Sequence, residues 1–309
     1  MQGTTGTSQI DAAIERMLAE SRFTLQERPG VVASSISRER LPLHEGPTVY
    51  IPKYGTVTTY ALTEGVDMAQ AQQITDTVMN LSPAEHGAQV VLTDMMLMTV
   101  RDEFFAVAGR ILADSFDRQR EQTLCDDFDN YSTALGSAGT SLAIGHVMAA
   151  HAAIKYGSPA AGAGRGGEPG PDPVYAVLTP AQIHSLKKTM SVQVPTYTNY
   201  QWVDGTTGAR NEFLANPAAA NYQSDFDAAG VRVRQSVNIN KDASDDAKSG
   251  VFSQQAQILV ELGDAPSAER ERDASLRAWE INFVGRWARG EYADGWGREM
   301  LFDSAAPTS

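Results

Sequence analysis

A stretch without helix breakers, from Thr99 to Tyr131, constrains the fold more than any other part of the chain. It contains no proline, and Gly109 is its only glycine. At 1.5 Å per residue the stretch predicts a single helix of roughly 50 Å, far longer than the average globular helix of about 11 residues. Thr99 followed by Asp102 predicts the N-terminal capping of this helix.

The apolar side chains of this stretch form a stripe that is interrupted in its middle. Residues 117–121 are all polar or charged. One half of the helix can therefore pack on a core, whereas its middle lacks an apolar face. A helix longer than its own core is typical of an extended molecule that contacts its neighbours. The stripe consists of Phe104, Ala108, Ile111, Leu112, Phe116, Leu124 and Phe128.

The composition predicts an acidic globular protein. With 309 residues, 42% of them hydrophobic, the chain can bury a core for one large domain or two ordinary ones. Lys and Arg total 25 against 38 Asp and Glu, and the net charge of −13 argues against binding nucleic acid through a basic surface. Cys125 is the only cysteine, which excludes an internal disulfide and favours synthesis in a reducing compartment.

No targeting or membrane segment is expected. The N-terminus lacks a basic region followed by an apolar run, and no stretch approaches 18 uncharged apolar residues. We therefore expect a soluble protein that is made in the cytoplasm and has no membrane contact.

The chain before the long helix is expected to be mostly extended. Ser8 and Asp11 predict the start of a short amphipathic helix, and residues 22–46 lack a sustained period and indicate an arm that lies on another surface. Alternation from Pro47 to Leu62 predicts two strands of a bent ribbon, and 74–92 predicts a second extended pair. An isolated ribbon is marginal in water, so a neighbouring surface should stabilise it.

The second half of the chain mixes helices and strands, which predicts an α+β fold. A strand buried on both faces is expected at Val174–Leu178, with a helix starting at Pro180. The other expected elements are a helix over 136–156, strands at 231–237 and 258–262 on either side of a polar loop at 238–249, and a long strand at 279–287 turned onto a shorter one at 300–302.

The sequence offers no catalytic residue, no cofactor and no metal ligand set that we would assign. None of the five histidines lies three or four residues from another histidine or from Cys125. The run GAGRGG at 162–167 lacks the ending of a phosphate-binding loop. Residues 240–246 alternate oxygen-bearing side chains as a calcium loop does, but lack its glycine and its final glutamate. We predict that the protein is not an enzyme.

Three segments resemble major capsid proteins of tailed bacteriophages, which have the Hong Kong 97 fold. They are PTVYIPKYGTVTTYALTEGVDM, HGAQVVLTDMML and the closing VGRWARGEYADGWGREML. In the coat proteins of short-tailed phages an LTEG-like segment follows the first ribbon. A G-x-x-V-x-L-[ST]-D segment, here Gly87 to Asp94, leads into the long helix. The resemblance covers nearly the whole chain.

The resemblance implies a division of the chain into the parts of that fold. It makes 1–45 an N-terminal arm and 46–80 an extended loop that lies over the adjacent subunit. Residues 81–135 and 266–309 would form a peripheral domain with the spine helix at 99–131, and 136–265 would form an axial domain around five- and six-fold vertices.

The same resemblance implies that the chain assembles with itself, as hexamers and pentamers in a shell that encloses double-stranded DNA without sequence-specific binding. A portal is implied, and a decoration protein would be compatible. A separate scaffolding protein is implied because no long helical segment precedes the arm. The candidate inter-subunit contacts are Lys53, Tyr54, Glu64, Asp67, Arg118, Arg120 and Glu121.

Two alternatives stay open at this point. An encapsulin-like shell that holds an enzyme cargo would share the fold. A monomeric carbohydrate- or metal-binding protein would use the aromatic-rich region 195–226 and the loop at Asn240. Sedimentation separates the monomer from either shell, and the contents of the particle separate the two shells.

Overall fold

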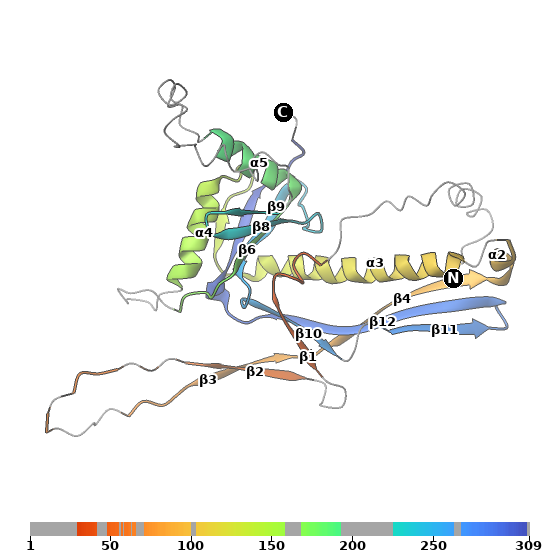
Figure 1. Ribbon diagram of the computed structural model, residues 1–309, viewed down its shortest axis with the longest axis horizontal. Helices are drawn as coiled ribbons and strands as arrows, with labels where there is room; N and C mark the ends of the chain where they lie inside the picture. The colour runs from red at the N-terminus through yellow and green to blue at the C-terminus, as the bar shows by residue number, and fades with distance from the viewer. Residues whose placement is uncertain are drawn as a thin grey trace, which may run out of the picture.

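Two β-sheets and a long helix that contacts both make up the body of the protein, and a two-stranded ribbon projects from it (Figure 1). This computed structural model describes the ranges 30–41, 48–55, 57, 59–62, 64–65, 71–99, 103–157, 168–192, 225–262 and 267–307.

The five-stranded sheet is organised around the long strand β12 (Ala278–Glu291). Along one side of β12 lie β11 (Ser267–Asp273) and β10 (Gln257–Leu262), both antiparallel to it, and β4 (Ala84–Thr93) lies antiparallel along the other side. β1 (Ser37–Leu41) adds to β10 in parallel. The expected strand at 279–287 is thus confirmed and extended.

The six-stranded sheet has mixed strand directions. Its order is β5 (Ala134–Gly136), β13 (Gly297–Asp303), β9 (Asp246–Ser253), β6 (Val174–Leu178), β8 (Val231–Gln235) and β7 (Phe226–Ala228). The sheet thus takes strands from both the expected axial range 136–265 and the expected peripheral range 266–309. The expected pairing of the last strand with its predecessor is wrong, because β13 pairs with β9 and β5 and not with β12.

Strand β6 is buried on both faces, and this burial explains its continuous apolar sequence. Helices α4 (Ile144–Tyr156) and α5 (Pro180–Val192) cover one face of the sheet and pack on Val174 and Ala176. Tyr175 and Val177, which alternate with them, face the second core formed with α3 and residues 32–36. Because both faces are covered, no polar position interrupts the strand. Of the helix expected within 136–156, only 144–156 is helical.

The long helix is shorter than the expected range 99–131. α3 runs over Glu103–Asp126, preceded by the separate helix α2 (Asp94–Thr99) and followed by the 3-10 turn η2 (Asp127–Asn130). Thr99 is the last residue of α2, and Asp102, its partner in the predicted N-terminal capping, lies outside the described residues. Within the predicted stripe, Leu112, Phe116, Leu124 and Phe128 are buried, whereas Ile111 is 53% exposed.

The ribbon pairs differently from the prediction. β2 (Val49–Tyr54) is antiparallel to β3 (Asp76–Leu81), so its two strands are separated by residues 55–75. Neither the expected pair within 47–62 nor the pair between 74–78 and 90–92 forms, since β4 instead pairs with β12. The base of the ribbon packs on the body through Leu81, Ile51 and Met79 against Ile258 and Val260.

Helix α3 and the η2 turn that follows it each approach one sheet closely, where a glycine faces an aromatic ring. A Cβ atom at Gly285 would lie 2.4 Å from Cζ of Phe116, and one at Gly250 would lie 2.5 Å from Cδ1 of Phe128. Gly285 is on the five-stranded sheet and Gly250 on the six-stranded sheet. Through these contacts α3, with Phe116, and the η2 turn, with Phe128, hold the two sheets together.

Gly285→Ala is expected to lower the free energy of unfolding by about 2 kcal/mol, because the new methyl group overpacks the Phe116 ring. Gly109→Ala, on helix α3 that carries Phe116, is the control. A Cβ there meets no atom within 4 Å, and the change should raise the free energy by about 0.5–1 kcal/mol through helix propensity. Urea unfolding of both variants checks this, and a neutral Gly285→Ala would contradict the packing.

Candidate assembly surface

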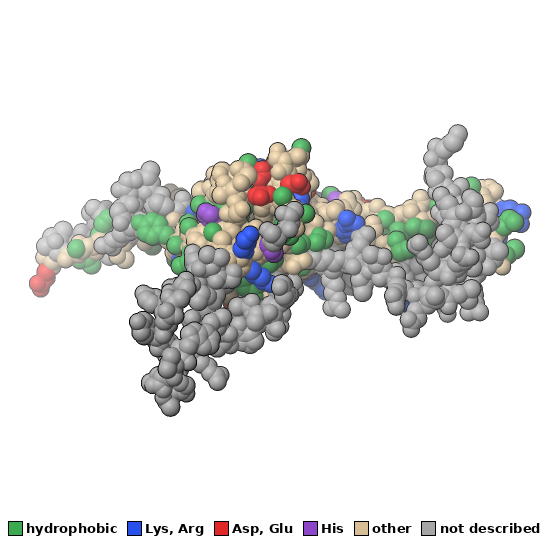
Figure 2. All heavy atoms as spheres, turned by 90° about the horizontal axis from the view of Figure 1, so that it is seen from above, with side chains coloured by type: hydrophobic (Ala, Val, Ile, Leu, Met, Phe, Trp, Pro, Cys, Tyr) green, Lys and Arg blue, Asp and Glu red, His purple; other side chains and the backbone are tan. Residues whose placement is uncertain are grey.

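The ribbon presents a row of exposed apolar side chains beyond its packed base. In Figure 2 hydrophobic side chains are visible along the projecting ribbon. Single exposed apolar residues are ordinary on protein surfaces, but several of them on one projecting ribbon indicate an interaction site. Each of the following is between 49% and 67% exposed: Tyr50, Tyr54, Val57, Tyr60, Leu62, Ile74 and Val78.

The predicted contact residues of the ribbon differ in their surroundings. Tyr54 and Glu64 are exposed, and Asp67 lies outside the described residues. Lys53 contacts its own chain. Its Nζ lies 3.5 Å from Oε2 of Glu168 and 5.8 and 5.5 Å from the ring centres of Tyr292 and Trp296. Lys53 therefore ties the ribbon to the segment that follows β12.

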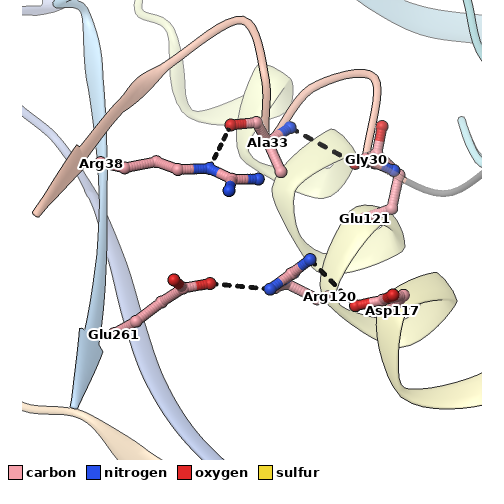
Figure 3. Close-up of polar contacts among 7 residues, drawn as sticks. All are labelled: Gly30, Ala33, Arg38, Asp117, Arg120, Glu121 and Glu261. Carbon is pink, nitrogen blue, oxygen red and sulfur yellow. Dashed lines mark hydrogen bonds and ion pairs between the residues drawn. The ribbon is translucent and has the colours of Figure 1, made fainter. Parts of the chain in front are cut away.

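The polar middle of α3 has partners within the chain (Figure 3). Nη1 of Arg120 donates a hydrogen bond to Oε1 of Glu261 at 2.7 Å, and Nη2 donates one to Oδ1 of Asp117 at 2.9 Å. Arg118 is exposed. The ion pair with Glu261 joins the helix to β10 of the five-stranded sheet.

Glu121 anchors the base of the N-terminal arm. Its carboxylate accepts backbone N–H bonds from Val32 at 2.6 Å, Gly30 at 3.2 Å and Ala33 at 3.4 Å, and only 1% of the residue is exposed. Burial raises the pKa of Glu121, although the three N–H groups and the charge of Arg120 act to lower it. Within this chain Glu121 is a buried anchor, with no surface left for another subunit.

The arm therefore begins on its own chain. Val32, Ala33 and Ile36 are buried in the core that contains the end of α3, and Nη1 of Arg234 donates hydrogen bonds to Ser34 and Ser35. β1 then joins the five-stranded sheet. The expected helix near residues 8–21 lies outside the described residues.

No sequence signal pairs Glu121 with residues 30–33 or Lys53 with Glu168. Each contact joins positions that lie far apart in the sequence, 89 residues apart for Val32 and Glu121. The local pattern around either position does not indicate the other. A glutamate in a polar helical stretch ordinarily faces solvent, whereas Glu121 is buried.

The described residues contain no cluster of three or more His, Cys, Asp or Glu side chains that could hold a metal ion. The loop that resembles a calcium site is organised by its own backbone. Oδ1 of Asp242 accepts N–H bonds from Ser244 and Asp246, and Oδ1 of Asp246 accepts one from Gly139. Among the helices of the described ranges, none is long and apolar enough to cross a membrane.

No protein-family model and no curated protein matches the sequence. Solved structures do match over nearly the whole chain. The acid-stable capsid of Helicobacter pylori bacteriophage KHP30 has a TM-score of 0.66 at 8% identity, covering 98% of this chain and 99% of that one. A structure from Mycobacterium phage Che8 has a TM-score of 0.62 at 16% identity, covering 92% and 96%. The capsid of cyanophage P-SCSP1u has a TM-score of 0.62 at 12% identity, covering 97% and 96%. The chain has the α+β fold of these phage capsid proteins, as its sequence motifs indicated.

Proposed function

We propose that this chain is the major capsid protein of a tailed bacteriophage, and that copies of it assemble into the icosahedral head shell that encloses the genome. The observation that carries the proposal is the ribbon. Its apolar side chains beyond the packed base are exposed in the single chain, and a two-stranded ribbon is marginal unless another surface covers it. A second copy of the chain supplies that surface. The fold shared with phage capsid proteins over most of the chain supports the same proposal.

The proposed contacts are heterologous, because the ribbon of one copy lies on a different surface of the next. Heterologous contacts generate rings when their rotation closes, and hexamers and pentamers are the rings that a closed icosahedral shell needs. Tyr54 and Glu64 on the ribbon and Arg118 on α3 are the exposed candidates for these contacts. Lys53, Arg120 and Glu121 instead position the ribbon and the arm within each copy.

The net negative charge is compatible with a shell that encloses DNA without binding it tightly. With 38 acidic against 25 basic side chains, the chain lacks the cation excess that neutralises phosphates in binding proteins. A motor-driven genome would meet little electrostatic retention at such a surface. We further propose a separate scaffolding protein and a portal, with a decoration protein as an optional addition, and no catalytic role for the chain.

Sedimentation and negative-stain electron microscopy of the purified full-length chain test this function. We expect closed particles of megadalton size or, without scaffolding protein, rings and open sheets made from the 33.3 kDa chain. A chain that sediments only as a monomer at all concentrations would overturn the proposal and favour the carbohydrate- or metal-binding alternative. Particles isolated from their natural source that hold an enzyme and no DNA would identify an encapsulin-like shell.

A further inference from the structure

Two chain segments cross from the five-stranded to the six-stranded sheet side by side at the end of α3 (Figure 1). One crossing runs from α3 through η2 to β5, and the other runs from β12 through the 3-10 turn η3 (Asp294–Trp296) to β13. They are bonded to each other. The N–H of Ser132 donates to Oδ1 of Asp294 at 2.7 Å, the Ser132 hydroxyl donates to Oδ2, and Arg289 pairs with Asp127 at 3.1 Å. These contacts join the two crossings where the five-stranded sheet meets the six-stranded sheet.

The contact between the crossings carries three carboxyl groups, those of Asp127, Glu291 and Asp294, beside the buried phenol of Tyr131. Across the described residues, three atoms here are buried and have no hydrogen-bond partner: Oδ2 of Asp127, Oε1 of Glu291 and the hydroxyl of Tyr131. The Tyr131 ring packs directly on Gly297, where a Cβ would lie only 1.9 Å from its Cε1. Buried polar atoms without partners cost free energy, so these three atoms destabilise the contact as it stands.

We propose that Glu291 is a proton-operated latch between the two sheets. When protonated, its carboxyl group donates a hydrogen bond to the Asp294 carboxylate and holds the β12 crossing against η2. When its proton is lost to solvent, two carboxylates face each other beside Asp127, and their repulsion loosens the crossing. This is a property of the single chain and goes beyond the shell, so its failure would leave the proposed function intact.

The surrounding groups place the proton on Glu291. Burial, followed by the charge of Asp294, the hydrogen bond to it and the charge of Asp127, raises the pKa of Glu291 from 4.5 to about 7. Burial also acts to raise the pKa of Asp294, but the hydrogen bonds from Ser132, with smaller contributions from Glu291 and Arg298, lower it overall. Two carboxyl groups within hydrogen-bond reach share one proton, which here stays with the less acidic partner.

The other charged groups around Glu291 do not neutralise it. Arg289, on the same strand, is paired with Asp127. Arg298, on β13, donates to the backbone carbonyls of Gly297 and Asp294. Gln257 faces Glu291 from β10 and is uncharged. Burial raises the pKa of Tyr131 well above its ordinary value, followed by the charges of Glu291, Asp127 and Asp294, so the phenol stays neutral.

The sign of the pH dependence follows from the raised pKa. A carboxyl that holds its proton more tightly in the folded chain contributes stability that is complete below the unfolded pKa of 4.5. That contribution is lost as the pH rises through about 7. The latch should therefore be closed at pH 6 and largely open at pH 8.

Hydrogen–deuterium exchange of the purified full-length chain at pH 6 and pH 8, corrected for the chemical exchange rate, tests the latch. Segments 127–133 and 291–297 should exchange about tenfold faster at pH 8 in the wild-type chain. Glu291→Gln keeps a neutral donor beside Asp294 and should exchange slowly at both values. Glu280→Gln is the matched control, because Glu280 lies on the same strand and accepts a hydrogen bond from Gln89; it should respond as the wild type does.

Either of two results would overturn the latch. One is equal protection of these segments at both pH values in the wild-type chain, a measurement that needs no variant to fold. The other is a pH response that persists in Glu291→Gln.

Discussion

Replacement of residues 56–75 by an Asn-Gly turn is expected to leave a folded subunit that forms no closed particle. The change keeps β2 and β3, whose pairing ends at Tyr54 and Asp76, and it keeps the packed base of the ribbon. A short turn of this type is well suited to joining two antiparallel strands. What is lost is the projecting part of the ribbon with four of its exposed apolar side chains, Val57, Tyr60, Leu62 and Ile74, which belong to the surface proposed to lie on the next copy.

The ribbon prediction separates folding from assembly by two measurements. Thermal unfolding of the shortened chain should stay cooperative, while sedimentation and electron microscopy should find no shells. A matched pair of full-length variants tests the apolar surface itself. Tyr60→Ser with Leu62→Ser should lose particles, because both exposed side chains become polar. Tyr60→Phe with Leu62→Met keeps the apolar area and should retain them. Normal shells from the shortened chain would refute the role of the ribbon.

The sequence predicted those elements whose signal is contained within the element itself. β6 shows a continuous apolar run because both of its faces are covered. β12 shows alternation because Ile281, Phe283 and Trp287, two residues or a multiple of two apart, pack into the cores. The apolar stripe of α3 marks the positions that do pack, Leu112 and Phe116 among them. In each case the burial of the segment determines which of its own residues are apolar, so the pattern is visible within the segment.

Pairing between distant strands could not be predicted in the same way. β9 holds Ser249, Gly250 and Ser253 at buried positions, so its sequence lacks the apolar alternation of a strand. Its serine hydroxyls bond to Gln182 and to the Pro171 carbonyl, and Gly250 leaves room for Phe128. The ends of both ribbon strands were also misjudged, because 55–75 contains residues of strand-like composition that extend the signal past Tyr54.

The packing of residues 30–41 on their own chain could not be predicted for a related reason. Residues 30–41 look unstructured in sequence because their regular contacts are with α3 and β10, far along the chain. A truncation meant to remove only an assembly arm should therefore stop before Gly30. Removal through residue 45 also deletes β1 and three buried side chains of the core, which confuses loss of assembly with loss of the fold.

Glu121→Ala is expected to lower the free energy of unfolding by about 3 kcal/mol. The substitution leaves the N–H groups of Val32 and Ala33 buried without their acceptor, and an unsatisfied buried donor costs about 1–3 kcal/mol. It also releases the turn that holds Val32, Ala33 and Ile36 in the core. Urea unfolding monitored by circular dichroism measures the change, and exchange of residues 30–36 should rise to the rate of an open segment.

Two further variants show whether the loss of stability in Glu121→Ala arises from the hydrogen bonds of this carboxylate to the arm. Gln122→Ala, the adjacent and exposed position on the same helix, should change the free energy by less than about 0.5 kcal/mol. Glu121→Gln keeps one acceptor oxygen at nearly the same place but loses the second, and its effect should fall between the two. If Glu121→Ala were no more destabilising than Gln122→Ala, the arm would not be held at this carboxylate. An arm fixed to its own helix before assembly begins each contact with the next subunit from a defined position, which reduces the ordering cost of that contact.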